Sequence, residues 1–152
     1  MCWYAYIATL KPLIGVLLSK DLPKTEESPP PLYFIEVTEY ERKLYRPFFE
    51  GQYLYAIGTN TGCGCGLNRG VAHTSETSER AVKIDYYNDA SPLAFIEFIK
   101  TYTQRDALEM YVVWEDDRLE PPLEKIIVNV QDMTIETYFK LKSRCFYTFF
   151  TT

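Results

Sequence analysis

The sequence predicts an α+β domain, with a mainly antiparallel sheet covered by one principal helix at residues 91–105. Several short stretches are rich in β-branched and aromatic residues, and in some of them apolar and polar side chains alternate. No regular series of helices separates these stretches, as a parallel sheet would require. Hydrophobic residues make up 47% and aromatic residues 16% of the 152-residue chain, which is enough for the packed core of a single domain spanning residues 1–152.

The strands are predicted from local composition and alternation. The first stretch, CWYAYIA, is apolar and aromatic, and the last, CFYTFF, is typical of a buried or edge strand. The strands expected, in chain order, are residues 2–8, 32–39, 52–58, 80–87, 108–115, 123–130 and 145–150. An acidic turn at residues 116–122 separates the strands on either side of it, so we expect those two strands to pair as a β-hairpin.

The principal helix is predicted from its start and from its apolar stripe. Ser91 suits the N-cap and Pro92 the first helical position. After them, apolar residues recur at helical spacing while polar residues cover the remaining surface. This stripe is wide enough to cover one face of the sheet.

Two shorter helices are also expected. The spacing Thr38-x-x-Glu41 matches a capping box, in which each residue's side chain binds the other's backbone N–H. The helix it opens must end before Pro47, because the residue before a proline avoids helical geometry. Residues 134–141 are expected to form another short helix.

Charge and hydropathy narrow the class of protein. The net charge of -5 and the absence of a basic tract argue against nonspecific nucleic-acid binding. The longest apolar run, residues 13–18, is too short to cross a bilayer, and Lys11 and Pro12 interrupt any signal-peptide pattern. We therefore expect a cytoplasmic protein with no nucleic-acid or membrane partner and with reduced cysteines. Its small-molecule or protein partner is left open.

The most unusual stretch is GCGCG, residues 62–66. If it is extended, Cys63 and Cys65 point to one side, and the glycines leave bare backbone on the other side for a close approach. Two thiolates side by side suit zinc, which takes three or four ligands from the protein. Cys2, on a strand that could pair beside this stretch, and His73, the chain's single histidine, complete the predicted zinc site.

Other interpretations of these cysteines stay open. They can be small core residues in a tight glycine-rich turn. If Met1 is removed, Cys2 becomes a candidate catalytic residue, with its free amine as the base of an N-terminal-nucleophile hydrolase. Cys63 and Cys65 can also act in thiol exchange. A protein-interaction domain without site chemistry is the remaining alternative.

Three motifs together resemble a family of small uncharacterised bacterial proteins. They are MCW at residues 1–3, YLY leading to GCGCG at residues 53–66, and WEDD followed by EPP at residues 114–122. The resemblance spans most of the chain. It implies a shared site near the cysteines at positions 2, 63 and 65, and it implies no particular activity.

Overall fold

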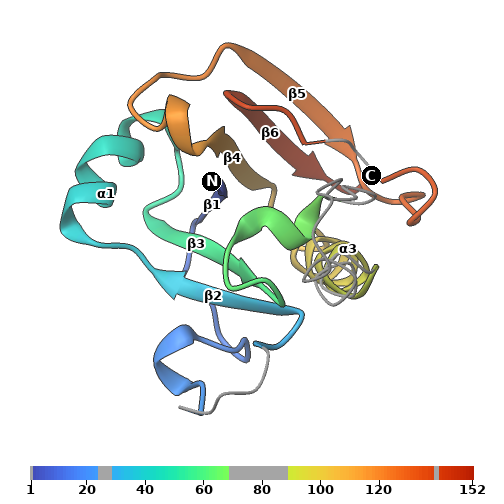
Figure 1. The fold of residues 1–152 in the computed structure, drawn as a ribbon. Coiled ribbons are helices and arrows are strands. Elements are labelled where there is room, and N and C mark those ends of the chain that lie inside the picture. The colour runs from blue at the N-terminus through green and yellow to red at the C-terminus, as the bar shows by residue number, and fades with distance from the viewer. Residues whose placement is uncertain (1, 24–28, 69–88, 139–140) are drawn as a thin grey trace, which may run out of the picture.

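The computed structural model describes residues 2–23, 29–68, 89–138 and 141–152. Within these residues, six strands form one sheet in the order β2-β3-β1-β4-β6-β5 (Figure 1). The strands are β1 (Trp3–Thr9), β2 (Leu32–Glu36), β3 (Tyr53–Thr59), β4 (Leu108–Trp114), β5 (Glu124–Asn129) and β6 (Cys145–Phe150). Every neighbouring pair is antiparallel except β5 and β6, which are parallel. The predicted α+β class with a mainly antiparallel sheet is confirmed.

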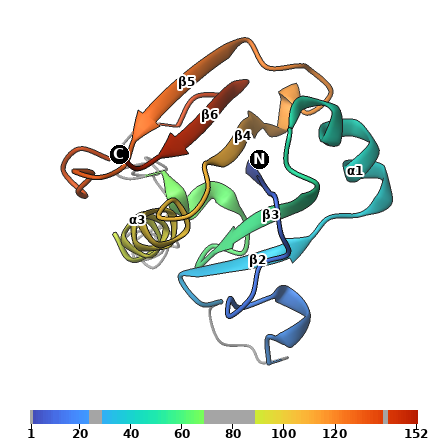
Figure 2. The same ribbon diagram turned by 180° about the vertical axis from the view of Figure 1, so that it is seen from behind.

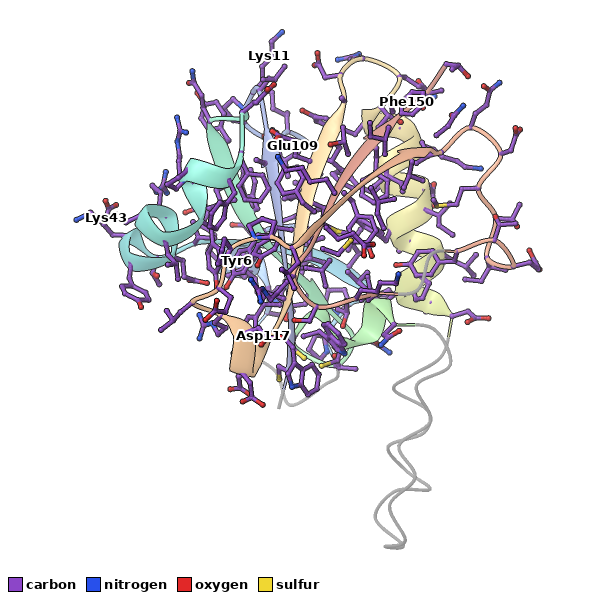
Figure 3. All side chains as sticks on the ribbon, turned by 90° about the horizontal axis from the view of Figure 1, so that it is seen from above. Tyr6, Lys11, Lys43, Glu109, Asp117 and Phe150 are labelled. Atoms are coloured by element: carbon purple, nitrogen blue, oxygen red, sulfur yellow. The ribbon has the colours of Figure 1, made fainter. Side chains whose placement is uncertain are left out.

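β1 lies inside the sheet, and its side chains alternate between two apolar cores. Ile7 belongs to the larger core, which the helix α3 (Ala90–Tyr102) covers with Phe95 and Ile99 among its buried residues. Tyr6 belongs to the smaller core, together with Tyr45 from the helix α1 (Glu39–Tyr45). The view from behind shows the two helices on opposite sides of the sheet (Figure 2), and the view from above shows Tyr6 on the α1 side (Figure 3).

The capping box of α1 is confirmed. The backbone N–H of Glu41 donates to Oγ1 of Thr38, and the backbone N–H of Thr38 donates to Oε1 of Glu41, each over 3.2 Å. The helix ends at Tyr45, and Pro47 lies in the 3-10 turn that follows. Local signals within ten residues therefore determined this element.

The principal helix α3 begins one residue earlier than predicted and ends at Tyr102 instead of residue 105. The prediction that Ser91 is the N-cap is wrong, because Asp89 takes that position and Ser91 lies inside the first turn, where it is fully buried. The Ser91 hydroxyl donates to the carbonyl of Pro31 over 2.6 Å and lies 3.0 Å from Oδ1 of Asn60. The serine therefore ties the start of α3 to the segments beside β2 and β3, a role that spacing along the helix does not reveal.

The predicted β-hairpin between the strands at 108–115 and 123–130 is wrong. β6 lies between β4 and β5: Val112 of β4 and Glu124 of β5 both pair with Cys145 of β6. β6 is the more apolar of the two candidate neighbours of β4 and is mostly buried, whereas β5 is mostly exposed. The most apolar strand takes the internal position because burial there removes more apolar surface from water.

Two further predictions concern the segments around these strands. The short helix expected at 134–141 is not formed by residues 134–138, which make hydrogen-bonded turns such as Thr137 N–H to the Thr134 carbonyl over 3.1 Å. The strand expected at 80–87 lies outside the described residues. In the part of the chain that the structure describes, no helix has both the length and the hydropathy needed to span a bilayer.

Candidate metal centre

Three cysteines from distant parts of the sequence meet at one end of the sheet. The Sγ atoms of Cys2, Cys63 and Cys65 all lie within 4.8 Å of one another. Cys2 immediately precedes β1, and the other two follow β3. Because β1 and β3 are antiparallel neighbours, the start of β1 lies beside the end of β3. The sheet topology therefore brings the three sulfurs together, in an arrangement that could hold a metal ion.

The turn after β3 holds Cys63 by hydrogen bonds to Thr59. Both the backbone N–H and the hydroxyl of Thr59 donate to the carbonyl of Cys63, over 3.1 and 2.5 Å. The same hydroxyl accepts from the N–H of Gly66 over 3.1 Å, and Thr59 is fully buried. Gly62 has φ +82°, a left-handed conformation that favours glycine. The backbone geometry of the turn therefore fixes the direction in which the Cys63 side chain points.

The extended conformation expected for GCGCG is wrong beyond Cys63. Cys63 itself is extended, with φ -147°, but Gly64–Leu67 forms a short 3-10 helix. The two sulfurs still lie within 4.8 Å of each other. The backbone N–H of Cys65 also donates to Sγ of Cys63 over 3.5 Å. The 3-10 turn, not strand alternation, places the two sulfurs on one side.

Gly64 confirms the close backbone approach that the sequence predicts. A Cβ on Gly64 would lie 2.8 Å from the carbonyl oxygen of Trp3, closer than real Cβ contacts allow. The start of β1 therefore packs directly on the backbone of the turn. This contact brings Cys2 within reach of Cys63 and Cys65.

Hydrogen-bond donors contact the sulfurs of Cys63 and Cys65. The backbone N–H of Trp3 donates to Sγ of Cys65 over 3.3 Å. Sγ of Cys63 accepts from the N–H of Cys65 and lies 3.5 Å from Oγ1 of Thr61. Donors of this kind stabilise negative charge on sulfur and orient it toward a ligand. Cysteine and histidine spacing does not reveal the roles of Thr61 and Thr59, although both stand in the TNTG run, residues 59–62, directly before Cys63.

The three thiols do not ionise equally. The pKa of Cys63 is lowered to about 5, chiefly because the Cys65 thiol donates a hydrogen bond to its sulfur. Burial acts in the opposite direction and raises this pKa. Hydrogen bonds from the Thr61 hydroxyl, the Cys65 N–H and the Cys2 thiol lower it further. Donation to Cys63 and burial raise the pKa of Cys65. Burial and the neighbouring Cys63 raise the pKa of Cys2. Without a metal, Cys63 is therefore the cysteine of the cluster whose ionisation is favoured near neutral pH.

Glu115 binds the backbone of Cys2 through two hydrogen bonds. Its Oε2 accepts from the backbone N–H of Cys2 over 3.2 Å, and its own N–H donates to the carbonyl of Cys2 over 3.0 Å. The rings of Trp3 and Trp114, directly paired across β1 and β4, meet edge to face with centroids 4.8 Å apart. These contacts hold the start of β1 against the end of β4, and with it the position of Cys2.

The remaining candidates are placed differently. His73 lies outside the described residues. Cys145 is fully buried within β6 and belongs to the larger core, so it takes no part in the sulfur cluster. Cys2 and Cys63 are half-buried, whereas Cys65 is buried. The cluster is therefore accessible from the side of Cys2 and Cys63.

No family model, curated protein or solved structure matches this chain. The resemblance described from its motifs stays a prediction.

Proposed function

We propose that Cys2, Cys63 and Cys65 bind one zinc ion as three thiolate ligands, and that the ion fastens the start of β1 to the turn after β3. The observation that carries this proposal is the mutual distance of the three sulfurs, all within 4.8 Å. Sulfurs bonded to one tetrahedral zinc at about 2.3 Å lie about 3.8 Å apart, so movements of about 1 Å at most would complete the site.

The donors around the cluster suit the charge that this site would carry. Three thiolates and one Zn²⁺ leave a net negative charge, which N–H and O–H donors to sulfur stabilise. These donors are the backbone N–H of Trp3, which binds the Cys65 sulfur, and the backbone N–H of Cys65 and the hydroxyl of Thr61, which bind the Cys63 sulfur. Thiolate ligands favour zinc or another thiophilic ion over calcium or magnesium, which prefer oxygen ligands.

The fourth ligand is water or His73. A water ligand would leave the open position typical of catalytic zinc, whereas the histidine would close a structural site. A His73→Ala variant separates these arrangements. Loss of zinc affinity would assign the histidine as a ligand, and unchanged affinity would assign the position to solvent.

The test is the metal content of the purified, reduced chain. We expect about one zinc per chain. Serine variants at positions 2, 63 and 65 should each lose it, and a Cys145→Ala variant should keep it, because that thiol is buried in β6. Replacing zinc with cobalt should give a thiolate charge-transfer band whose intensity falls in each of the three serine variants. A chain that binds no zinc after reduction and reloading would refute the proposal.

A second candidate, a thiol-dependent enzyme, is favoured by the contacts of the Cys63 sulfur: the Cys65 N–H and the Thr61 hydroxyl each lie 3.5 Å from it, and the pKa of Cys63 is lowered to about 5. A stable thiolate at neutral pH is the usual property of a catalytic cysteine. This candidate places the nucleophile at Cys63 and not at Cys2, whose pKa is raised. A metal-free protein as purified, with one rapidly alkylated cysteine, would favour this candidate over the zinc site.

A further inference from the structure

We propose that Cys2 and Cys63 form a reversible disulfide in the presence of hydrogen peroxide, and that this bond replaces zinc as the cross-link between β1 and the turn after β3. The release of zinc rests on the function proposed above. The disulfide itself does not, because it requires only the two sulfurs and the oxidant.

Three pairings are available within the cluster, and the structure favours one. Cys63 and Cys65 stand only two residues apart, so a disulfide between them would close a small, strained ring. Cys65 is buried and its sulfur accepts the N–H of Trp3. Cys2 and Cys63 are both half-buried, so a small oxidant reaches them first. Their sulfurs lie within 4.8 Å, and a disulfide of about 2.05 Å requires them to close by less than about 3 Å.

The oxidation proceeds in two balanced steps. The Cys63 thiolate attacks one oxygen of hydrogen peroxide, the O–O bond breaks, and the departing hydroxide takes up a proton to become water, leaving a sulfenic acid on Cys63. The Cys2 thiol then gives up its proton as its sulfur attacks the sulfenic sulfur, and the hydroxyl group leaves with a proton as a second water. Two electrons pass from the two sulfurs to peroxide, and an S–S bond forms. Zinc is released because only Cys65 remains as a thiolate ligand.

The disulfide would join the same two segments as the metal. Cys2 directly precedes β1, and Cys63 lies in the turn that follows β3. Gly64 and Trp3 already hold these segments in backbone contact, with no room for a Cβ between them. Oxidation should therefore exchange one cross-link for another without unfolding the sheet, so that the change can be reversed by a thiol reductant.

The test uses the full chain, both zinc-loaded and metal-free. Equimolar peroxide should release about one zinc to a chromogenic chelator and lower the intact mass by about 2 Da. Peptide mapping without reduction should join the peptides that contain Cys2 and Cys63, and dithiothreitol should reverse the change. A Cys145→Ala control should behave as the native chain does. A metal-free Cys65→Ser variant should still form the bond, and a Cys2→Ser variant should not.

The outcomes separate this inference from the proposed zinc site. If the chain binds no zinc but its metal-free form gives the Cys2–Cys63 bond, the zinc proposal fails and the disulfide stands. If zinc binds and peroxide instead joins Cys63 to Cys65, the disulfide inference is wrong. It is equally overturned if the mass rises by about 32 Da through a sulfinic acid with no disulfide.

Discussion

The backbone N–H of Trp3 donates to the sulfur of Cys65 over 3.3 Å, between residues 62 positions apart in the chain. A Cβ on Gly64 would lie only 2.8 Å from the carbonyl oxygen of Trp3. Trp3 therefore contacts the cysteine turn through both of its backbone polar groups. These contacts hold the segment that carries Cys2, and they make the site sensitive to changes in residues that bear no metal ligand.

Gly64→Ala should weaken both the fold and the metal site. The added methyl group would press on the Trp3 carbonyl, and backbone cannot give way as a flexible side chain can. We expect a loss of about 1–3 kcal/mol in the free energy of unfolding and a zinc affinity reduced by about ten-fold or more. Urea denaturation and chelator competition measure the two effects.

Gly51→Ala is the matched control for that substitution. A Cβ on Gly51 would lie 2.9 Å from the Ala8 carbonyl carbon, a similar approach to β1 at its other end. The control should lose comparable stability and keep its zinc affinity. Equal zinc affinities in both variants would show that the Trp3 contact does not position the site.

Thr59→Val should destabilise the turn. The buried Thr59 hydroxyl donates to the Cys63 carbonyl and accepts from the N–H of Gly66, which would lose this acceptor. Leaving a buried donor without a partner costs about 1–3 kcal/mol. The urea midpoint of the metal-free chain should fall accordingly, whereas the exposed Thr101→Val should shift it little. An unchanged midpoint in Thr59→Val would contradict this account of the turn.

Zinc binding should release protons and strengthen as pH rises. All three sulfurs must be thiolates in the complex, and in the metal-free chain the pKa is lowered to about 5 for Cys63 but raised for Cys2 and Cys65. About two protons should therefore leave per zinc between about pH 6 and about pH 8, and nearly three below about pH 5. Calorimetry in buffers of different ionisation enthalpy measures this number. Release of no proton near neutral pH would mean that these sulfurs are not the ligands.

Cys63 should be the first cysteine to be alkylated in the metal-free chain. With its pKa lowered to about 5, Cys63 is about 90% thiolate at about pH 6, whereas a thiol at the ordinary value is about 0.1% ionised. Timed iodoacetamide labelling followed by peptide mapping should show Cys63 first and the buried Cys145 among the last. Thr61→Val removes a hydroxyl 3.5 Å from the Cys63 sulfur, so it should raise that pKa and slow the labelling at this pH. Preferential labelling of Cys2 would refute the assignment.

The sequence predicted those features that depend on neighbours in the chain. The Thr38–Glu41 capping box is a contact across one helical turn. Each strand that the structure describes was predicted from alternation or apolar composition within that strand alone. The glycines beside Cys63 predicted a close backbone approach, which Gly64 makes with Trp3. Each signal is complete within a few residues, so no knowledge of the fold was needed to find it.

What the sequence left undetermined depends on competition among distant segments. The pairing of β5 with β6 in place of β4 is decided by which strand buries more apolar surface beside β4, and that comparison involves the whole sheet. The 3-10 turn at Gly64–Leu67 likewise forms where β1 and Thr59 already limit the space. The two thiols of the GCGCG stretch are thus evident from the chain alone. The sequence could name Cys2 as the third ligand only by assuming that the first strand pairs beside this stretch. The antiparallel packing of β1 on β3 makes that pairing and brings the third sulfur to them, because backbone pairing between strands is a tertiary contact that spacing along the chain does not encode.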